Sequence, residues 1–358
     1  MIAEGAWKKN RTPYQKDDPE LPRSWGATCT LPQPERKRRL LPLCVAGILC
    51  AFGLVLLLPR APATQYPSPE VSQASAPARK AVRSNSAVLY GFPEGEYAEA
   101  VYSSEQLLRG KLPLVDGEHP IPDNAPAPNT LQIAAHGKGV IPVRDLSLKS
   151  AAETIDALYA LFYAARQKGI EGLAVYRATL SASEQRDWQL DRARVYSSSL
   201  SLTDAAALAR SEVDDPGQSE HQLGYTVDIR LFGSWGGAAD DRPLGLTEQG
   251  RYLLQNAWRY GFVMCYPDAE SEDKAHQFRY VGVAHSTAMT YLDLRLADYL
   301  ALLHERGVVQ IHEKGAPRYL IVCKELHNDR VGFSLPVGAD YEASYDNCGY
   351  AVVACTYR

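Results

Sequence analysis

Residues 225–231 alternate between apolar and polar side chains, which is the period of a β-strand with two unlike faces. The apolar positions are Tyr225, Val227, Ile229 and Leu231. Asp228 lies at the centre of the polar positions. We therefore predict a half-buried strand that carries the Asp228 carboxylate on its polar face.

A histidine stands seven residues before this aspartate, with a glycine between the two. Gly224 permits the backbone to turn, so His221 and Asp228 can converge on one point. An imidazole nitrogen and a carboxylate oxygen that meet in this way form half of a plausible zinc site. Taken alone, such a pair is more commonly a loop histidine followed by a solvated aspartate. The assignment therefore depends on the neighbouring sequence.

The other periodicities mix helices and strands. Helical spacing predicts helices over residues 151–168, 181–193, 202–213, 247–260 and 287–306. Runs typical of strands occupy residues 173–176, 278–283, 319–323, 331–335 and 350–356. The first helix is expected to begin with a capping box formed by Ser150 and Glu153. These patterns predict a folded domain over residues 87–306 and a small β-rich appendage over residues 307–358.

The first 86 residues lack such periodicity. Residues 1–39 are polar and charged, which predicts a disordered tail. Residues 40–59 carry no charge, and a run of about twenty apolar residues is long enough to cross a bilayer as a helix. The basic cluster at residues 36–39 predicts a cytoplasmic N-terminus and an extracellular C-terminal domain. A cleaved signal peptide is the alternative, because residues 61–63 resemble a cleavage site.

Residues 60–86 are rich in proline, alanine and serine, which predicts a semi-extended linker between this single membrane span and the folded domain. The expected location is therefore the cell membrane. The net charge of −4 gives no reason to expect a nucleic-acid partner, and we expect a monomer. Four cysteines follow the apolar segment: Cys265, Cys323, Cys348 and Cys355. They could pair in three ways or remain as small buried hydrophobic residues.

Residues 219–228 read Ser-x-His-x-x-Gly-x-(small)-x-Asp. This pattern resembles the signature of the VanY-type zinc D-alanyl-D-alanine carboxypeptidases, a family that also contains LD-carboxypeptidases. Two further blocks agree in order: Val-Tyr-Arg, which ends at Arg177 and is followed by Gln185, and Phe-Arg-Tyr-Val-Gly at residues 278–282. The resemblance covers residues 112–303. It implies an α+β fold in which helices flank an antiparallel sheet.

The resemblance also implies roles for individual residues. His221 and Asp228 match the zinc ligands, and Arg177 matches the residue that binds the C-terminal carboxylate of the peptide, for which a planar guanidinium is well suited. Gln185 and Ser219 match polar contacts around that carboxylate. A catalytic zinc needs three protein ligands. It supplies hydroxide and polarises the scissile carbonyl, while a nearby carboxylate carries the proton to the leaving amine.

The chain departs from the family pattern at the third ligand and the base. Counting back from Arg279, Gln277 occupies the position of the expected histidine and Lys274 that of the expected glutamate. His276 lies one residue away and forms an Asp-x-x-His pair with Asp273. Either a one-residue bulge brings both into the ligand and base roles, or the site has decayed. A shift of one residue along a strand turns a side chain to the other face of the sheet. His276 can therefore reach the ligand position only if the bulge is present.

Two functions follow from the resemblance. The first is a membrane-anchored zinc carboxypeptidase that removes the terminal D-alanine from peptidoglycan stem peptides. The second is a catalytically lapsed domain that binds cell-wall peptides or a partner, and a purely structural use of the fold is a third hypothesis. Metal content separates them, because only the first requires bound zinc.

Overall fold

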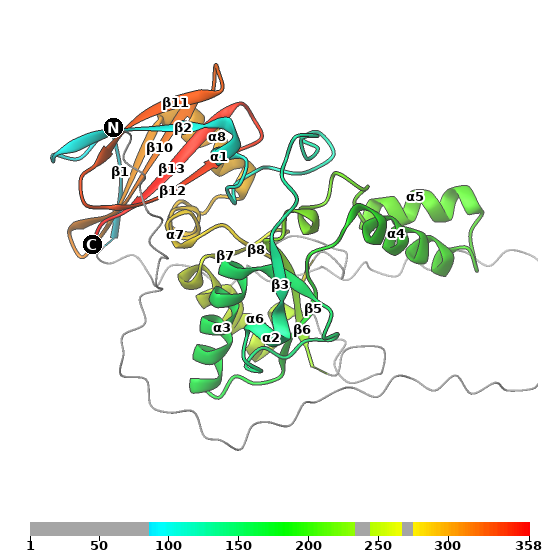
Figure 1. The fold of residues 1–358 in the computed structure, drawn as a ribbon. Coiled ribbons are helices and arrows are strands. Elements are labelled where there is room, and N and C mark those ends of the chain that lie inside the picture. The colour runs from blue at the N-terminus through cyan, green and yellow to red at the C-terminus, as the bar shows by residue number, and fades with distance from the viewer. Residues whose placement is uncertain (1–85, 233–243, 267–274) are drawn as a thin grey trace, which may run out of the picture. The chain divides into compact units, whose positions relative to one another are not determined.

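The computed structural model describes residues 86–232, 244–266 and 275–358 (Figure 1). The predicted tail at residues 1–39, the membrane helix at residues 40–59, residues 60–85 of the linker and Asp273 lie outside these ranges. Within the ranges, none of the helices combines the length and the apolar character that a membrane crossing requires.

The carboxypeptidase-like region is the predicted domain at residues 87–306. Its centre is a four-stranded antiparallel sheet in the order β5-β6-β8-β7 (Figure 1). Its strands are β5 (Leu173–Arg177), β6 (Thr226–Leu231), β7 (Phe262–Met264) and β8 (Gln277–Tyr280). The alternation predicted for β6 is confirmed, because Val227 and Ile229 belong to the apolar core. The expectation of a half-buried strand is wrong, because every residue of β6 is buried. Other parts of the chain cover the polar face, and a strand pattern carries no signal of them.

Helices pack against the apolar face of this sheet. Those that share its core are α3 (Ala152–Gln167), α6 (Glu248–Asn256) and the 3-10 helix η4 (Ala257–Tyr260). Shorter elements nearby are the strands β3 (Thr130–Gln132) and β4 (Lys149–Ala151), the helix α2 (Ile133–His136) and the 3-10 helix η3 (Leu244–Leu246).

The capping box expected at the start of α3 is not formed. The N-cap residue is Ala151, whose side chain has no hydrogen-bonding atom. Ser150 belongs to β4, and its hydroxyl donates to the carbonyl oxygen of Gly224 (2.8 Å). Ser150 therefore makes a long-range contact with the turn before β6 and does not form the cap of α3 that its spacing in the sequence had predicted.

The helices α4 (Ala182–Tyr196) and α5 (Leu202–Glu212) form a hairpin that extends away from the sheet (Figure 1). The first begins with a capping box, in which the Ser181 hydroxyl accepts from the Glu184 backbone and the Glu184 carboxylate accepts from the Ser181 backbone. Ser201 caps the second. Both helices lie where the periodicity predicts them.

A second layer contains strands from both ends of the described chain. A five-stranded antiparallel sheet has the order β1-β9-β10-β13-β12, and β11 pairs separately with β2. These strands are β1 (Ser86–Tyr90), β2 (Tyr97–Ser103), β9 (Val308–Glu313), β10 (Ala316–Glu325), β11 (Arg330–Pro336), β12 (Asp340–Tyr345) and β13 (Tyr350–Thr356), with the short helix α1 (Ser104–Leu107) after β2. Residues 86–103 therefore pair with strands of the predicted appendage.

The helices α7 (Val283–Leu292) and α8 (Leu296–Arg306) share a core with this second layer. The sequence predicted one continuous helix over residues 287–306. Asp293 interrupts it with a left-handed backbone (φ 58°), so the chain forms two helices instead. The α+β fold with an antiparallel sheet flanked by helices is confirmed.

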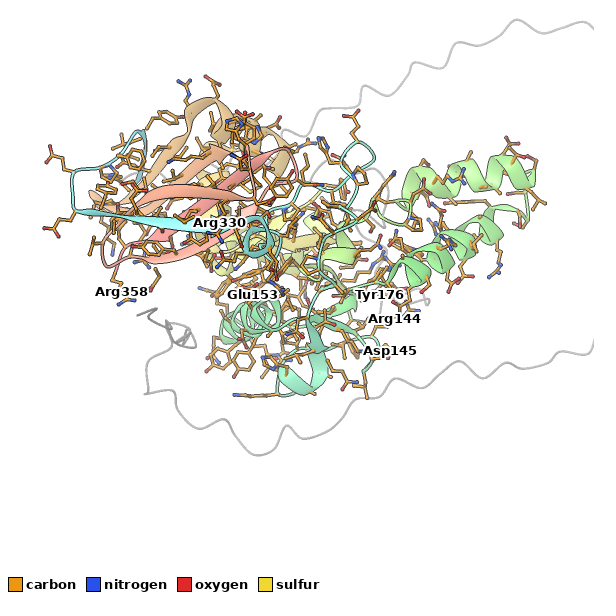
Figure 2. The ribbon with its side chains drawn as sticks, turned by 45° about the horizontal axis from the view of Figure 1, so that its top comes forward. Arg144, Asp145, Glu153, Tyr176, Arg330 and Arg358 are labelled. Carbon is orange, nitrogen blue, oxygen red and sulfur yellow. The ribbon has the colours of Figure 1, made fainter. Side chains whose placement is uncertain are left out.

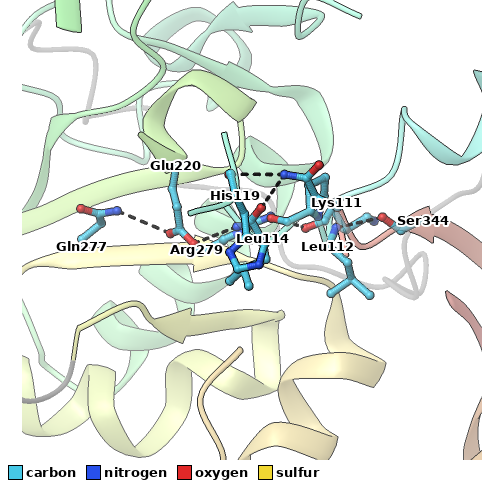
Figure 3. A network of polar contacts seen from close by, with 10 residues as sticks. Lys111, Leu112, Leu114, His119, Glu220, Gln277, Arg279 and Ser344 are labelled. Carbon is cyan, nitrogen blue, oxygen red and sulfur yellow. Dashed lines mark hydrogen bonds and ion pairs between the residues drawn. The ribbon is translucent and has the colours of Figure 1, made fainter. Parts of the chain in front are cut away.

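Residues 111–114 connect the two layers through buried polar contacts (Figure 3). Arg279 of β8 donates to the carbonyl oxygens of Lys111 and Pro113, at 2.9 Å each. On the other side, the backbone N–H of Leu112 donates to the Ser344 hydroxyl of β12 (3.0 Å). The backbone of this segment is thereby fixed to both sheets.

Candidate functional site

His221 and Asp228 face each other in the buried centre of the carboxypeptidase-like region. The 3-10 helix η2 (Glu220–Leu223) carries the histidine and β6 carries the aspartate. Gly224 joins them with a φ of 85°, a backbone conformation that glycine adopts without strain. The His221 Nε2 and Asp228 Oδ1 atoms lie 3.1 Å apart. The predicted convergence of the two side chains is therefore present.

Hydrogen bonding fixes the orientation of this imidazole. His221 Nδ1 lies 2.9 Å from the carbonyl oxygen of Ala178. A carbonyl can only accept, so Nδ1 carries a proton and donates it. The Nε2 atom is then directed at the carboxylate, an arrangement typical of histidines that bind metals through Nε2.

The two facing atoms fit a shared cation. Although they are 3.1 Å apart, the geometry is not that of a hydrogen bond, and neither atom has a hydrogen-bond partner among the described residues. A nitrogen lone pair and a carboxylate oxygen repel each other at this distance unless a proton or a metal ion lies close to both. His221 and Asp228 therefore suit two ligand positions of a zinc ion.

Arg177 lies beside this pair because β5 contains a bulge. Its register against β6 shifts between Val175 and Arg177, which leaves Tyr176 as the extra residue and pairs Arg177 with Asp228. Arg177 Nη1 donates to Asp228 Oδ2 (2.6 Å). The residue expected to bind a peptide carboxylate is thus beside the predicted metal ligands, where it holds the carboxylate of one of them.

These positive neighbours keep Asp228 ionised. Burial by itself raises the pKa of Asp228, because the charged form loses its hydration. When no metal is bound, a proton on His221 Nε2 would make the imidazole positive, and that charge together with Arg177 outweighs burial and lowers the pKa to about 2. The carboxylate is therefore negative at neutral pH, as a metal ligand must be.

Trp188 of α4 contacts both members of the site. The guanidinium carbon of Arg177 lies 3.4 Å from the centroid of the Trp188 ring. The same ring packs edge to face against His221, with the ring centroids 6.1 Å apart. Trp188 was not among the residues predicted from the sequence to belong to the site. It could have been predicted from its position three residues after Gln185 on a predicted helix, because residues three apart share one helix face.

The register of β6 against β8 determines which side chain faces Asp228. The two strands pair without a shift, and Asp228 lies opposite Gln277. The side chain of Gln277 is therefore on the face of Asp228, where its amide donates to Glu220 (3.5 Å; Figure 3). The Ile229 backbone N–H donates to the carbonyl oxygen of His276 (3.0 Å), which continues the same register. Over these paired residues the strands contain no bulge, so Gln277 rather than His276 lies on the face of Asp228.

Among the described residues, the side chain at the third ligand position does not fit zinc. The part of the chain that the structure describes contains no group of three His, Cys, Asp or Glu side chains able to hold a metal ion. His276 is buried, but it does not join His221 and Asp228 in such a group. The side chain in register with Asp228 is a neutral amide, which is not among the usual ligands of protein zinc sites.

The two remaining predicted contacts are buried. Gln185 has no exposed surface, and its amide nitrogen donates to the carbonyl oxygen of Asp214 (2.7 Å), so it ties α4 to the chain before η2. Ser219 directly precedes η2 and is also buried. The contacts of both residues with a peptide carboxylate stay predictions.

Comparison with known proteins gives a consistent result. Residues 147–283 match the family model described as VanY, D-alanyl-D-alanine carboxypeptidase. A D-alanyl-D-alanine carboxypeptidase of Enterococcus faecalis is 34% identical over 149 residues, which are 39% of this chain and 51% of that protein. A putative carboxypeptidase of Bacillus subtilis, YodJ, is 31% identical over 153 residues, which are 41% of this chain and 52% of that protein.

The chain thus spans about half the length of the curated relatives it matches. Among solved structures, the vancomycin resistance D,D-dipeptidase VanXYg is similar in fold. Its TM-score is 0.57 at 20% sequence identity, and the match covers 74% of this chain and 100% of that chain. The resemblance to the VanY-type family of D-alanyl-D-alanine carboxypeptidases is thus confirmed for the domain at residues 147–283.

Proposed function

We propose that this VanY-type domain binds the D-alanyl-D-alanine end of peptidoglycan stem peptides, and that binding rather than hydrolysis is its main activity. The observation that carries the proposal is the pairing of Asp228 with Gln277. Among the described residues it leaves two zinc ligands where a catalytic site needs three, while Arg177 stays beside them. A guanidinium held against a half-buried aromatic ring is suited to a peptide carboxylate.

Zinc-dependent removal of the terminal D-alanine is the second candidate. It is favoured by the His221 and Asp228 atoms, which face each other without a hydrogen bond. It also requires a third ligand and a base, for which His276 and Asp273 stay predictions. Bound zinc would supply hydroxide at neutral pH. Asp228 and the imidazole oriented by Ala178 would hold it.

Calorimetry with a synthetic pentapeptide ending in D-Ala-D-Ala tests the proposal. We expect the full chain to bind the peptide in the absence of zinc and to release no D-alanine when zinc is added. An Arg177→Lys variant keeps the charge but loses the two-pronged geometry, so its affinity should fall by about 1.5–3 kcal/mol. Absence of peptide binding would overturn the proposal, and release of D-alanine with zinc would select hydrolysis.

Two variants test whether position 277 or His276 faces the zinc ligands. Gln277→His places an imidazole opposite Asp228. This imidazole would be a third ligand beside His221 and Asp228, so zinc affinity should rise at least tenfold. His276→Ala should leave the zinc affinity of the chain unchanged. A loss of zinc binding in the His276→Ala variant would show that His276 is a ligand after all.

The proposed location is the outer face of the cell membrane, with residues 40–59 as the anchor. The support is the uncharged run behind the basic cluster at residues 36–39. Protease added to intact cells should digest the C-terminal domain and spare the N-terminal tail. A secreted protein that lacks residues 1–63 would show a cleaved signal peptide instead.

A further inference from the structure

Three arginine side chains surround the ring of Tyr176. The guanidinium carbons of Arg144, Arg230 and Arg177 lie 4.2, 4.7 and 5.6 Å from its centroid. Figure 2 shows Tyr176 and Arg144 close together. The ring is the extra residue of the β5 bulge. A bulge changes the direction of a side chain, and here it places the tyrosine next to three positive charges.

The backbone fixes the position of Arg144. The Arg144 N–H donates to the carbonyl oxygen of Val175, and the Val175 N–H donates to that of Pro142, at 2.8 Å each. Val143 and Val175 thus form a parallel bridge at the edge of β5. The side chain of Arg144 is exposed, while its backbone is held to the sheet by these hydrogen bonds.

The three arginines differ in how their charge is neutralised. Arg177 is paired with Asp228 at 2.6 Å. Arg230 is buried, and its charge contributes to the low pKa of Asp228. Arg144 makes no ion pair with any residue that the structure describes. Its positive charge is therefore accessible, a short distance from the predicted carboxylate site.

The stacking geometry leaves the donors of Arg144 available. A guanidinium that lies over an aromatic ring uses its flat face for that contact. Its N–H groups point outward in the plane of the guanidinium and can still donate two parallel hydrogen bonds to one carboxylate. An arginine oriented by a ring is thus prepared for an anion, and loses less conformational entropy on binding than a free side chain.

We propose that Arg144 binds a second carboxylate of the same peptide, two or three residues before its C-terminus. The inference rests on the proposed function, in which Arg177 takes the C-terminal carboxylate. The guanidinium carbons of Arg144 and Arg177 lie 4.2 and 5.6 Å from one ring centroid, so they are at most 9.8 Å (4.2 + 5.6) apart. Two or three extended residues, at about 3.3–3.6 Å each, span about 7–11 Å, which is compatible with this limit. The preferred ligand is a peptide with a free side-chain or α-carboxylate at that position, and an amidated peptide binds less well.

A matched pair of peptides tests this. Both are pentapeptides that end in D-Ala-D-Ala and carry a γ-linked D-glutamyl residue at the second position, with its α-carboxyl free in one and amidated in the other. The full chain should bind the free acid about tenfold more tightly, which corresponds to about 1.4 kcal/mol. Arg144→Gln should remove this preference and change the affinity for the amidated peptide less than twofold. Arg330→Gln, an exposed arginine on β11, is the control and should keep the preference.

The outcomes separate this inference from the function on which it rests. If the wild-type chain binds both peptides equally well, the second carboxylate site is wrong and the proposed function stands. If neither peptide binds, both fail. A preference for the free acid that survives in Arg144→Gln also overturns the assignment, because another residue then makes the contact. Circular dichroism of each variant confirms that it is folded.

Discussion

At the scale of single residues, Asp228 shows how neighbours set the charge of a buried acid. Burial opposes ionisation, but His221 and Arg177 outweigh it and hold the pKa at about 2, below the ordinary value of 3.8. A carboxyl group whose pKa is depressed by folding stabilises the fold above its ordinary pKa. That stabilisation is lost as the pH falls through the folded value.

We expect Asp228→Asn to lower the free energy of unfolding at pH 7 by about 3–5 kcal/mol, because Arg177 is left without its buried carboxylate. The difference from wild type should shrink from about pH 4 to about pH 2, as the wild-type carboxylate takes up its proton. Urea denaturation at several pH values measures both quantities. A difference that stays constant over this window would contradict the assigned pKa.

At the scale of elements, the turn between η2 and β6 brings the two predicted metal ligands together. Gly224 has a φ of 85°, and a β-carbon added there would lie 2.8 Å from the β-carbon of Pro128. The carbonyl oxygen of Gly224 accepts hydrogen bonds from the Ser150 hydroxyl (2.8 Å) and from the Ala151 backbone N–H (2.9 Å). Both the conformation and the surroundings of this turn therefore demand glycine.

Gly224→Ala should lower the free energy of unfolding by about 2–4 kcal/mol, from backbone strain and a steric clash together. Gly217→Ala is the matched control: its φ is 87°, but a β-carbon there meets nothing within 4 Å. It should cost only about 1–2 kcal/mol, the strain alone. Chemical denaturation of both variants measures the difference. Equal losses would mean that the contact with Pro128 relaxes freely.

At the scale of the whole described chain, a buried lysine joins the two layers. Lys111 Nζ contacts Glu153 of α3 (2.6 Å) and Glu342 of β12 (3.2 Å). Burial by itself lowers the pKa of Lys111, but the negative Glu342 and Glu153 outweigh it and raise the pKa. The backbone of the same segment accepts from Arg279, which also donates to Glu220 beside His221 (2.8 Å). The β-rich layer is therefore physically continuous with the candidate site.

Lys111→Met should lower the free energy of unfolding by about 1–3 kcal/mol, because two carboxylates lose their shared cation; their partial exposure limits the effect. Unfolding should remain a single transition, since the contacts couple the layers. Lys324→Met, an exposed lysine that contacts the carbonyl oxygen of Gly332, is the control and should cost less than about 0.5 kcal/mol. Differential scanning calorimetry checks both, and two separate transitions would show that the layers unfold independently.

The local features of this protein could be predicted from its sequence. The alternation along β6, the helices α4 and α5, and the convergence of His221 with Asp228 follow from periodicity and from one glycine. These features depend on residues close together in the chain, whose side-chain directions are set by the repeat of a strand or a helix. The resemblance to the VanY-type family rested on the same short motifs.

Features that depend on residues far apart in the chain could be seen only in the folded structure. Ser150 was assigned to a helix cap, but it bonds to Gly224 instead. Residues 86–103 joined strands more than 200 positions away. The choice between His276 and Gln277 required the register of β8 against β6. A shift of one residue reverses the face of every side chain in a strand, and this shift is fixed by hydrogen bonds between strands rather than by the sequence of either one.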